Sequence, residues 1–199
     1  MRELATTRLA ALCLNRRGRP RGLTYDDHLV RGALVLDLAV CGALAHTEDA
    51  VELDHARAAA HGLADVAAEV DEGDTGLQWW LDHGRLGFDD WRARLVDAGI
   101  WRLRPWSLRF PFQSFEDTER ERTEADRAAG RRLVRTGTEA PTTLVVLALG
   151  SISGVFGAIE DPPSWVLEDL GGAGWAGELV VERLTDLRVR MRSIGHAVD

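Results

Sequence analysis

The chain has 199 residues, of which 45% are hydrophobic and 28% are charged. These values are typical of one globular domain with a sizeable core and argue against a fibre or a disordered tail. The 24 basic residues, all of them arginine, are outnumbered by 32 acidic residues. The resulting net charge of -8 argues against an obligate DNA-coating protein, so we expect no nucleic-acid partner.

Cysteine content and the apolar segments point to a cytoplasmic protein. Cys13 and Cys41 are too few to form a disulfide framework, and no secretory signal is evident at the first residues. Residues 141–159 carry no charge and approach the length of a membrane span. Three glycines and two serines make this segment less apolar than a typical span, which favours a helix buried among other helices.

The first elements are an apolar run and a long buried helix. Residues 9–14 are apolar and lead into a turn, residues 15–22, that is rich in arginine, glycine and proline. Thr24 and Asp27 have capping-box spacing and predict a helix start. Residues 29–44 are almost wholly apolar, so we expect a core helix that ends at Gly42 or shortly after.

The middle of the chain predicts short elements. Residues 46–74 are acidic, with a strand at 51–53 and an alanine-rich helix at 56–70. Short amphipathic helices are expected at 76–84 and 88–98. Residues 100–112 alternate aromatic and arginine side chains around Pro105, which predicts a β-hairpin with its turn at that proline.

The remaining pattern is helical. It predicts a charged helix at 116–135, a buried one at 139–159, a short one at 164–170 and an amphipathic one at 178–192. We expect a mainly α fold: one domain over residues 1–199, with central helices at 29–44 and 144–159 wrapped by amphipathic helices, plus a small β-hairpin.

Each candidate motif for catalysis or cofactor binding lacks a residue or a context that its chemistry requires. A G-x-G-x-x-G run at 172–177 follows a helical pattern and lacks an acidic ribose partner, so it does not predict dinucleotide binding. Gly150 and Gly154 flank Ile152 where a nucleophile elbow needs serine, and their spacing predicts close helix packing instead. The histidines lack metal-site spacing. We expect no enzyme, no cofactor and no metal site.

Two arginine clusters are the most informative feature. Arg16, Arg17, Arg19 and Arg21 share one turn, and Arg102, Arg104 and Arg109 alternate with Trp101, Trp106, Phe110 and Phe112. Guanidinium groups bind phosphates bidentately, and adjacent exposed aromatics suit a lipid interface or a nucleobase stack. It stays open whether the aromatics face the core and only the arginines face water. We expect at least Trp106 to be exposed.

The order of several weak motifs over residues 4–161 resembles the Golgi phosphoprotein 3 family. The motifs are the apolar run 9–14 with the following turn at 17–20, the helix at 29–44, the segment Arg94 to Ile100, Arg109-Phe110-Pro111, and the apolar helix from Leu144. The family includes a yeast vacuolar-sorting relative and many actinobacterial members. The chain resembles the actinobacterial type.

The resemblance implies a fold, a site and a partner class. Members have a helical core and a hairpin used in self-association, which implies a homo-oligomer. Eukaryotic members are peripheral membrane proteins, not enzymes; they bind phosphatidylinositol 4-phosphate in a shallow basic pocket and act as adaptors for glycosyltransferase tails. By position, Arg31 and Arg85 would bind the headgroup, and Tyr25 is the aromatic nearest the position of the pocket tryptophan.

We therefore expect a cytoplasmic, peripherally membrane-associated adaptor that binds an anionic lipid headgroup without catalysis. The headgroup site would comprise Arg31, Arg85, Tyr25, Arg17 and Arg19, and the hairpin residues Arg102, Arg104, Trp106 and Arg109 would contact the membrane or a second copy. Tails of membrane enzymes are expected partners. The alternative is a soluble protein-interaction adaptor or regulator in which the arginines meet acidic partner tails.

Overall fold

A computed structural model describes residues 1–22, 26–47, 51–71, 76–105 and 113–195. In chain order the elements are α1 (Ala5–Leu12), α2 (Asp26–Val40), β1 (Leu44–His46), β2 (Val51–Leu53), α3 (His55–Ala60), α4 (Ala64–Asp71), α5 (Leu77–His83), α6 (Phe88–Asp97), β3 (Trp101–Leu103), β4 (Phe115–Asp117), α7 (Arg120–Arg132), α8 (Pro141–Ser153), α9 (Ser164–Glu168), the 3-10 helix η1 (Gly171–Ala173) and α10 (Gly174–Gly195).

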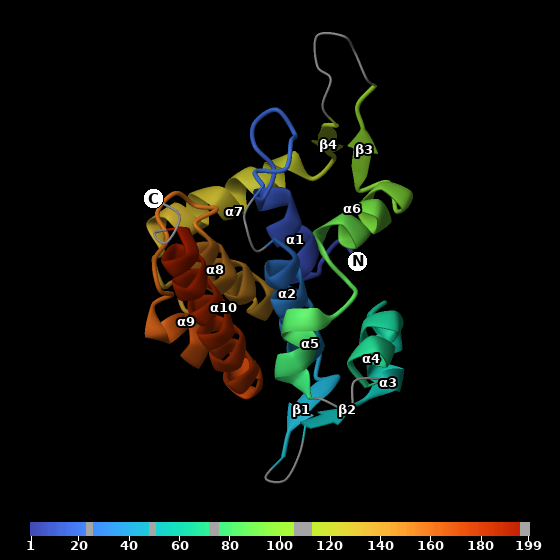
Figure 1. The fold of residues 1–199 in the computed structure, drawn as a ribbon, viewed down its shortest axis with the longest axis vertical. Coiled ribbons are helices and arrows are strands. Elements are labelled where there is room, and N and C mark those ends of the chain that lie inside the picture. The colour runs from blue at the N-terminus through green and yellow to red at the C-terminus, as the bar shows by residue number, and fades with distance from the viewer. Residues whose placement is uncertain (23–25, 48–50, 72–75, 106–112, 196–199) are drawn as a thin grey trace.

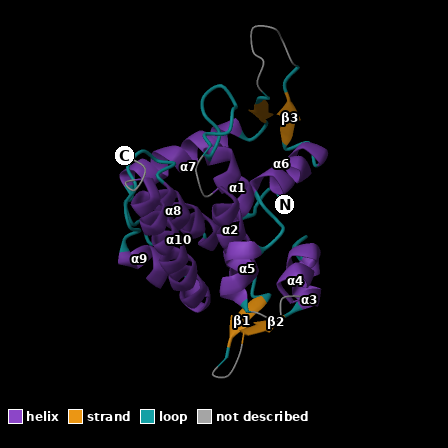
Figure 2. Cartoon of the chain, viewed as in Figure 1, coloured by secondary structure: helices purple, strands orange, loops and turns teal. Residues whose placement is uncertain are grey.

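Helices α2 and α8 form the centre of the molecule, and α1 and α10 pack against both (Figure 1). Every residue of α8 from Leu144 onward is buried, as are residues 29–39 of α2. Helices that are apolar on all sides are stable only when other helices surround them. The predicted mainly helical fold with two buried central helices is confirmed, and helices dominate the drawing in Figure 2.

Both central helices end earlier than predicted, each near a glycine in the left-handed region. Gly154 directly follows α8 with φ +73°, and Gly42 lies two residues after α2 with φ +71°. Glycine is the residue that adopts this conformation without steric cost, so it ends helices. No helix among the described residues is long and apolar enough to cross a membrane.

A hairpin that the sequence did not predict follows α2. Leu44, expected in the helix, begins β1, which pairs antiparallel with β2. The strand predicted at 51–53 is confirmed. The alanine-rich helix predicted at 56–70 is two helices, α3 and α4, because Gly62 has φ +73° between them.

The second hairpin exists, but its predicted second strand is wrong. Strand β3 pairs with β4 in the register Trp101 to Asp117 and Leu103 to Phe115, so the returning strand lies beyond residue 112. Phe115 is buried, and its ring centroid is 5.6 Å from that of Trp101. Burial of this aromatic pair explains the register better than a turn at Pro105. Residues 106–112 lie outside the described part of the chain.

Gly150 has a role different from the predicted close approach of another helix backbone. A Cβ atom at Gly150 would lie 2.3 Å from the ring of Phe156, and a Cβ at Gly130 of α7 would lie 2.3 Å from the same ring. The two glycines therefore make room for one buried aromatic ring between α7 and α8.

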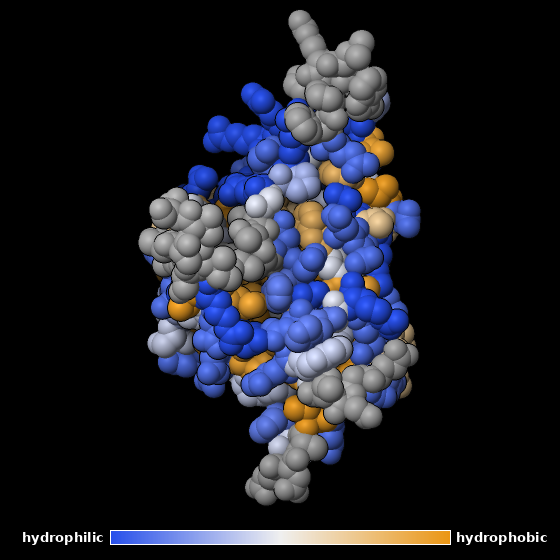
Figure 3. Space-filling view, viewed as in Figure 1, coloured by the Kyte–Doolittle hydropathy of each residue, from blue (hydrophilic) through white to orange (hydrophobic). Residues whose placement is uncertain are grey.

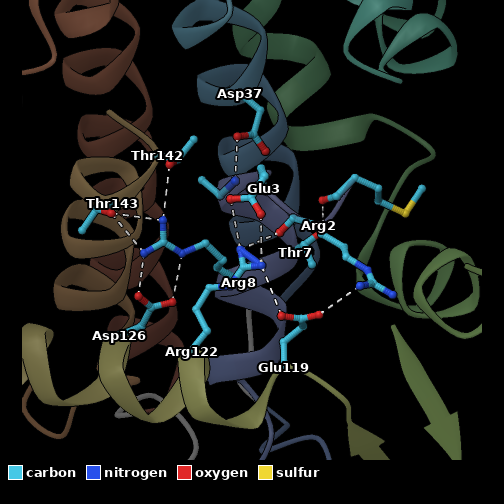
Figure 4. A network of polar contacts seen from close by, with 12 residues as sticks. Arg2, Glu3, Thr7, Arg8, Asp37, Glu119, Arg122, Asp126, Thr142 and Thr143 are labelled. Carbon is cyan, nitrogen blue, oxygen red and sulfur yellow. Dashed lines mark hydrogen bonds and ion pairs between the residues drawn. The ribbon is translucent and has the colours of Figure 1, made fainter. Parts of the chain in front are cut away.

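A polar network ties α1 to three other helices (Figure 4). Arg8 of α1 donates to both carboxylate oxygens of Asp126 on α7, at 3.0 and 2.5 Å, and to Thr143 of α8 at 3.1 Å. Asp37 of α2 accepts hydrogen bonds from the backbone N–H groups of Ala5 and Thr6 and from the Thr6 hydroxyl. These contacts fix the position of α1 and of the loop that follows it.

Candidate anion-binding site

The loop after α1, residues 15–22, is folded by its own polar groups. The Asn15 carboxamide oxygen accepts hydrogen bonds from the N–H groups of Arg17 at 2.8 Å and Arg19 at 3.2 Å, and the Asn15 N–H donates to the Arg19 carbonyl. Gly18 at the bend has φ +74°. Asparagine and glycine are typical of such turns. The side chains of Arg16 and Arg17 are exposed.

This loop lies directly against the second hairpin. The Phe115 N–H of β4 donates to the Gly18 carbonyl at 2.7 Å, and a Cβ atom at position 18 would lie 1.9 Å from the Phe115 carbonyl oxygen. Only glycine allows an approach this close. The contact brings the arginines of the loop next to Arg102 and Arg104, which the sequence places more than 80 residues away.

Between the loop, the hairpin and α7 lies a cleft of about 430 Å³, which we call the arginine cleft. Its charged lining residues are Arg16, Arg102, Arg104, Arg120, Arg127, Glu116, Asp117 and Glu124. In the space-filling view, hydrophilic side chains gather at the upper left of the molecule, where Figure 1 shows the loop after α1 (Figure 3). Arginines from three separate segments thus meet at one place.

Positive charge is in excess in the arginine cleft. The side chains of Arg16, Arg104 and Arg120 are exposed and have no ion-pair partner among the described residues. The cleft's carboxylates, by contrast, have partners: Asp117 accepts a hydrogen bond from the Thr123 hydroxyl at 2.6 Å, and Glu124 forms a 2.8 Å ion pair with Arg127. The remaining carboxylate, Glu116, is opposite Arg102 in the strand register.

Arg127 forms the buried wall of the cleft. It is 7% exposed, and its second amino group donates to the Leu14 carbonyl at 3.4 Å. Its Nε–H is buried and has no hydrogen-bond partner within the described residues. Burial lowers the pKa of the nearby Arg21 guanidinium, and the positive charges of Arg127 and Arg131 lower it further.

Arg31 of α2 occupies a different position, inside the molecule against the end of α5 and the segment that follows it. It is 5% exposed, and its guanidinium donates to the carbonyls of four residues at 2.7 to 3.3 Å: Leu81, Asp82, Gly84 and Leu86. Burial lowers the pKa of this guanidinium, which the carboxylates of Asp27, Asp82 and Glu69 partly offset. Arg31 therefore fixes the segment that bears Arg85.

Glu69 of α4 holds the same segment in place through the backbone N–H groups of that segment. Its carboxylate accepts hydrogen bonds from the backbone N–H groups of Arg85 and Leu86. The exposed guanidinium of Arg85 lies with its Nε 3.9 Å from Glu69. The Asp27 carboxylate, expected at the start of its own helix, accepts the N–H of Phe88 at 2.8 Å and so caps α6.

The predicted site residues thus fall into two groups. Arg31 lies beside the segment of Arg85, whereas Arg17 and Arg19 lie on the loop of the arginine cleft, with Arg102 and Arg104 across from it. Tyr25, Trp106 and Arg109 lie outside the described residues. Headgroup binding by Arg31 and Arg85 stays a prediction, and the buried guanidinium of Arg31 is already hydrogen bonded to protein carbonyls.

Sequence reasoning missed Arg120 and Arg127. They are seven residues apart, two helical turns, and therefore lie on one face of the helix expected at 116–135. That spacing is the sequence feature from which a shared arginine face on this helix could have been predicted. It also missed Arg92, whose guanidinium lies 5.2 Å from the ring centroid of Phe115 and lines a hollow with Arg19, Pro20 and Gln113.

The described residues contain no group of three or more histidine, cysteine, aspartate or glutamate side chains that could bind a metal ion. In comparisons with known proteins, the family model of Golgi phosphoprotein 3 (GPP34) matches residues 7–186. No curated protein and no solved structure matches the chain.

Proposed function

The chain belongs to the Golgi phosphoprotein 3 family, and we propose that it is a non-enzymatic protein that docks peripherally on anionic membranes. The observation that carries this proposal is the convergence of Arg16, Arg102, Arg104 and Arg120 at one end of an acidic protein. An acidic protein needs such a concentrated basic surface to approach an anionic leaflet.

The expected affinity is low. Each arginine near an anionic membrane surface contributes about 1 kcal/mol, so four contribute about 4 kcal/mol, which corresponds to a dissociation constant of about 1 mM. Self-association, expected from the family resemblance, would raise the apparent affinity because a second contact then forms at high effective concentration. Docking would be reversible and sensitive to salt.

Vesicle flotation tests this proposal. The protein should float with vesicles that contain phosphatidylglycerol but not with neutral phosphatidylcholine vesicles, and binding should fall as salt is raised. The variant Arg102→Ser with Arg104→Ser removes two exposed guanidinium groups of the hairpin. Arg190→Ser removes one exposed arginine from α10 and is the control for either single substitution, because α10 packs on α2, α8, α9 and α5 and does not line the cleft.

The double variant should lose most of its binding, and the control should retain it. Equal recovery with neutral and anionic vesicles would contradict membrane docking through charge. No vesicle binding, together with capture of acidic peptides by the wild-type chain alone, would favour the soluble protein-interaction adaptor.

Finer features of this proposal come from the sequence and from the family resemblance. From the sequence we expect one domain over residues 1–199 and a cytoplasmic location. From the resemblance we expect headgroup binding at Arg31 and Arg85, tails of membrane enzymes as partners, a homo-oligomer and an actinobacterial-type family member. Arg85→Ser tests this headgroup binding because this exposed side chain can be removed while the Glu69 contacts to the backbone remain. Its loss should weaken binding to phosphatidylinositol 4-phosphate vesicles.

A further inference from the structure

We infer that Arg31 of α2 and Arg183 of α10 are positioning residues for Arg85: they hold the backbone that carries this exposed side chain, and neither contacts the anion. The inference rests on one finer feature of the proposed function, anion binding at Arg85. It replaces the direct headgroup contact that the resemblance implies for Arg31 with an indirect role. It also adds a residue of α10, a helix that the resemblance does not assign to the site.

The first argument is that every nitrogen of the Arg31 guanidinium donates to a protein carbonyl. Nε donates to Leu81 at 2.7 Å and Nη2 to Asp82 at 3.1 Å. Nη1 donates to Gly84 at 2.8 Å and to Leu86 at 3.3 Å. A guanidinium binds an anion bidentately through two neighbouring N–H groups. Because Arg31 is only 5% exposed, such a contact would require some of these hydrogen bonds to break.

The second argument is that charged side chains bind the backbone of residues 84–87 on both its polar sides. Arg31 donates to carbonyls of this segment, and the Glu69 carboxylate of α4 accepts the N–H groups of Arg85 and Leu86. The segment up to residue 87 belongs to no helix or strand, so these side chains take the place of regular backbone partners. The backbone is therefore held in place, while the Arg85 side chain is 77% exposed.

The third argument is the close packing of Arg31 on this segment. A Cβ atom at Gly84 would lie 2.9 Å from the Arg31 Cδ atom and 2.7 Å from the Trp80 carbonyl oxygen. Glycine is the residue that permits so close an approach. The aliphatic part of the Arg31 side chain thus lies directly against the backbone one residue before Arg85. A shift of Arg31 would therefore displace Arg85.

The fourth argument is that Arg183 holds the end of α5, just before this segment. Its guanidinium donates to both carboxylate oxygens of Asp82, with 2.7 Å between Nε and Oδ1. The two side chains are 23% and 16% exposed, so salt screens this ion pair less than a surface pair. The carbonyl of the same Asp82 accepts a hydrogen bond from Arg31. Helices α2 and α10 thus both hold a residue that lies three positions before Arg85.

Amide hydrogen exchange of the protein without vesicles measures the positioning directly. Arg183→Gln removes the ion pair with Asp82, and Arg188→Gln, which removes an ion pair between α10 and Asp161, is the matched control. The Arg85 amide should exchange severalfold faster in Arg183→Gln, because local opening of the segment then costs less free energy. In Arg188→Gln it should exchange at the wild-type rate. A wild-type rate in both variants would overturn the inference.

A double-mutant cycle tests whether Arg31 acts through Arg85, on phosphatidylcholine vesicles that contain phosphatidylinositol 4-phosphate. Arg85→Ser should weaken binding roughly tenfold, about the effect of one charge-assisted hydrogen bond. Arg31→Lys keeps the positive charge but cannot donate to all four carbonyls, so alone it should lose most of the same factor. In the Arg85→Ser background it should cause no further loss, because no side chain is left to position.

Arg183→Gln provides the same cycle at a partly exposed side chain, so the inference stays testable if Arg31→Lys does not fold. Arg183→Gln should weaken vesicle binding severalfold by itself and not at all in the Arg85→Ser background. Arg188→Gln should leave binding unchanged in both backgrounds.

Losses that multiply in both cycles would mean that Arg31 and Arg183 act independently of Arg85 and would overturn the inference. Wild-type affinity of Arg85→Ser would overturn it too, and membrane docking through the arginine cleft would stand in either case. Absence of wild-type binding to every vesicle would overturn the proposed function together with the inference.

Discussion

At the scale of single residues, the same side chain has three roles in this protein. The guanidinium of Arg8 is partly buried against a carboxylate, that of Arg31 is buried against backbone carbonyls, and that of Arg16 is exposed. Burial and partners, not residue type, decide which arginines are available to a ligand.

Arg8 should be hard to replace, even by lysine. A lysine ammonium cannot donate two parallel hydrogen bonds to Asp126 and also contact Thr143 as the guanidinium does. We expect Arg8→Lys to lower the free energy of unfolding by about 1–2 kcal/mol and Arg8→Ala by about 3–5 kcal/mol, since alanine leaves the buried Asp126 carboxylate unpaired. Urea denaturation measures both, and an alanine variant as stable as the lysine variant would contradict this role.

Asp37 predicts a pH-dependent stability. Burial raises the pKa of this carboxyl from 3.8 to about 6, although hydrogen bonds from Thr6 and Ala5 oppose the rise. Between these two values the folded state binds a proton that the unfolded state releases. The stability contribution of Asp37 is therefore fully present below pH 3.8 and is lost as pH rises through 6, by about 3 kcal/mol in total.

Asp37→Asn isolates this effect. The unfolding free energy of wild type minus that of the variant should fall by about 3 kcal/mol between pH 3.5 and 7 and be constant above, because contributions of the other titrating groups cancel in the difference. Chemical denaturation at several pH values provides the measurement. A difference that does not change over this range would show that Asp37 has the same pKa in both states.

At the scale of elements, Phe156 determines how α7 and α8 pack. Gly150→Ala gains helix propensity of up to about 1 kcal/mol, but its Cβ would collide with the Phe156 ring at 2.3 Å, which costs about 1–3 kcal/mol. We expect a net loss in thermal stability. Adding Phe156→Leu should restore part of that loss, because the smaller side chain leaves room for the methyl group.

Gly172→Ala is the control for this experiment. An added Cβ at Gly172 would have no heavy atom within 4 Å, and this glycine does not have a positive φ. Its melting temperature should stay close to that of wild type. If Gly150→Ala is equally neutral, the ring of Phe156 moves aside freely and does not determine the packing of the two helices.

The sequence predicted the elements that depend on local pattern. The cores of α2 and α8 follow from long apolar runs, and their ends depend on single glycines whose conformation only the structure shows. The register of β3 and β4 could not be predicted from residues 100–112, because it depends on burial of Phe115 against Trp101. The polarity pattern alone is compatible both with the predicted returning strand before residue 112 and with the observed strand β4.

The site was predicted only in pieces. Both arginine clusters were recognised in the sequence, but their meeting depends on one hydrogen bond between Gly18 and Phe115, 97 residues apart. The family resemblance assigned Arg31 to headgroup binding. In the structure, its guanidinium donates hydrogen bonds to backbone carbonyls of a neighbouring segment. Long-range contacts of this kind leave no local pattern in the chain.

At the scale of the whole molecule, Gly18 connects the loop to the hairpin. Gly18→Ala places a Cβ 1.9 Å from the Phe115 carbonyl oxygen, so we expect the loop to leave β4 and binding to anionic vesicles to fall while every arginine is retained. Gly22→Ala is the matched control, since Gly22 also has a positive φ but no neighbour within 4 Å. Circular dichroism should show helix content unchanged in both variants. Vesicle binding by Gly18→Ala as tight as that of wild type would contradict the coupling between the loop and the hairpin.

The two hairpins lie at opposite ends of the longest axis of the molecule (Figure 1). The end with β3 and β4 carries the arginine cleft, and the other end carries β2, α3 and α4, whose described segment 51–71 has five acidic residues and one arginine. Such a separation of charge is an electric dipole along the long axis. Near an anionic surface it produces a torque that turns the protein upright, with the acidic end pointing into solution, and neutron reflectometry would then record a layer as thick as the molecule is long.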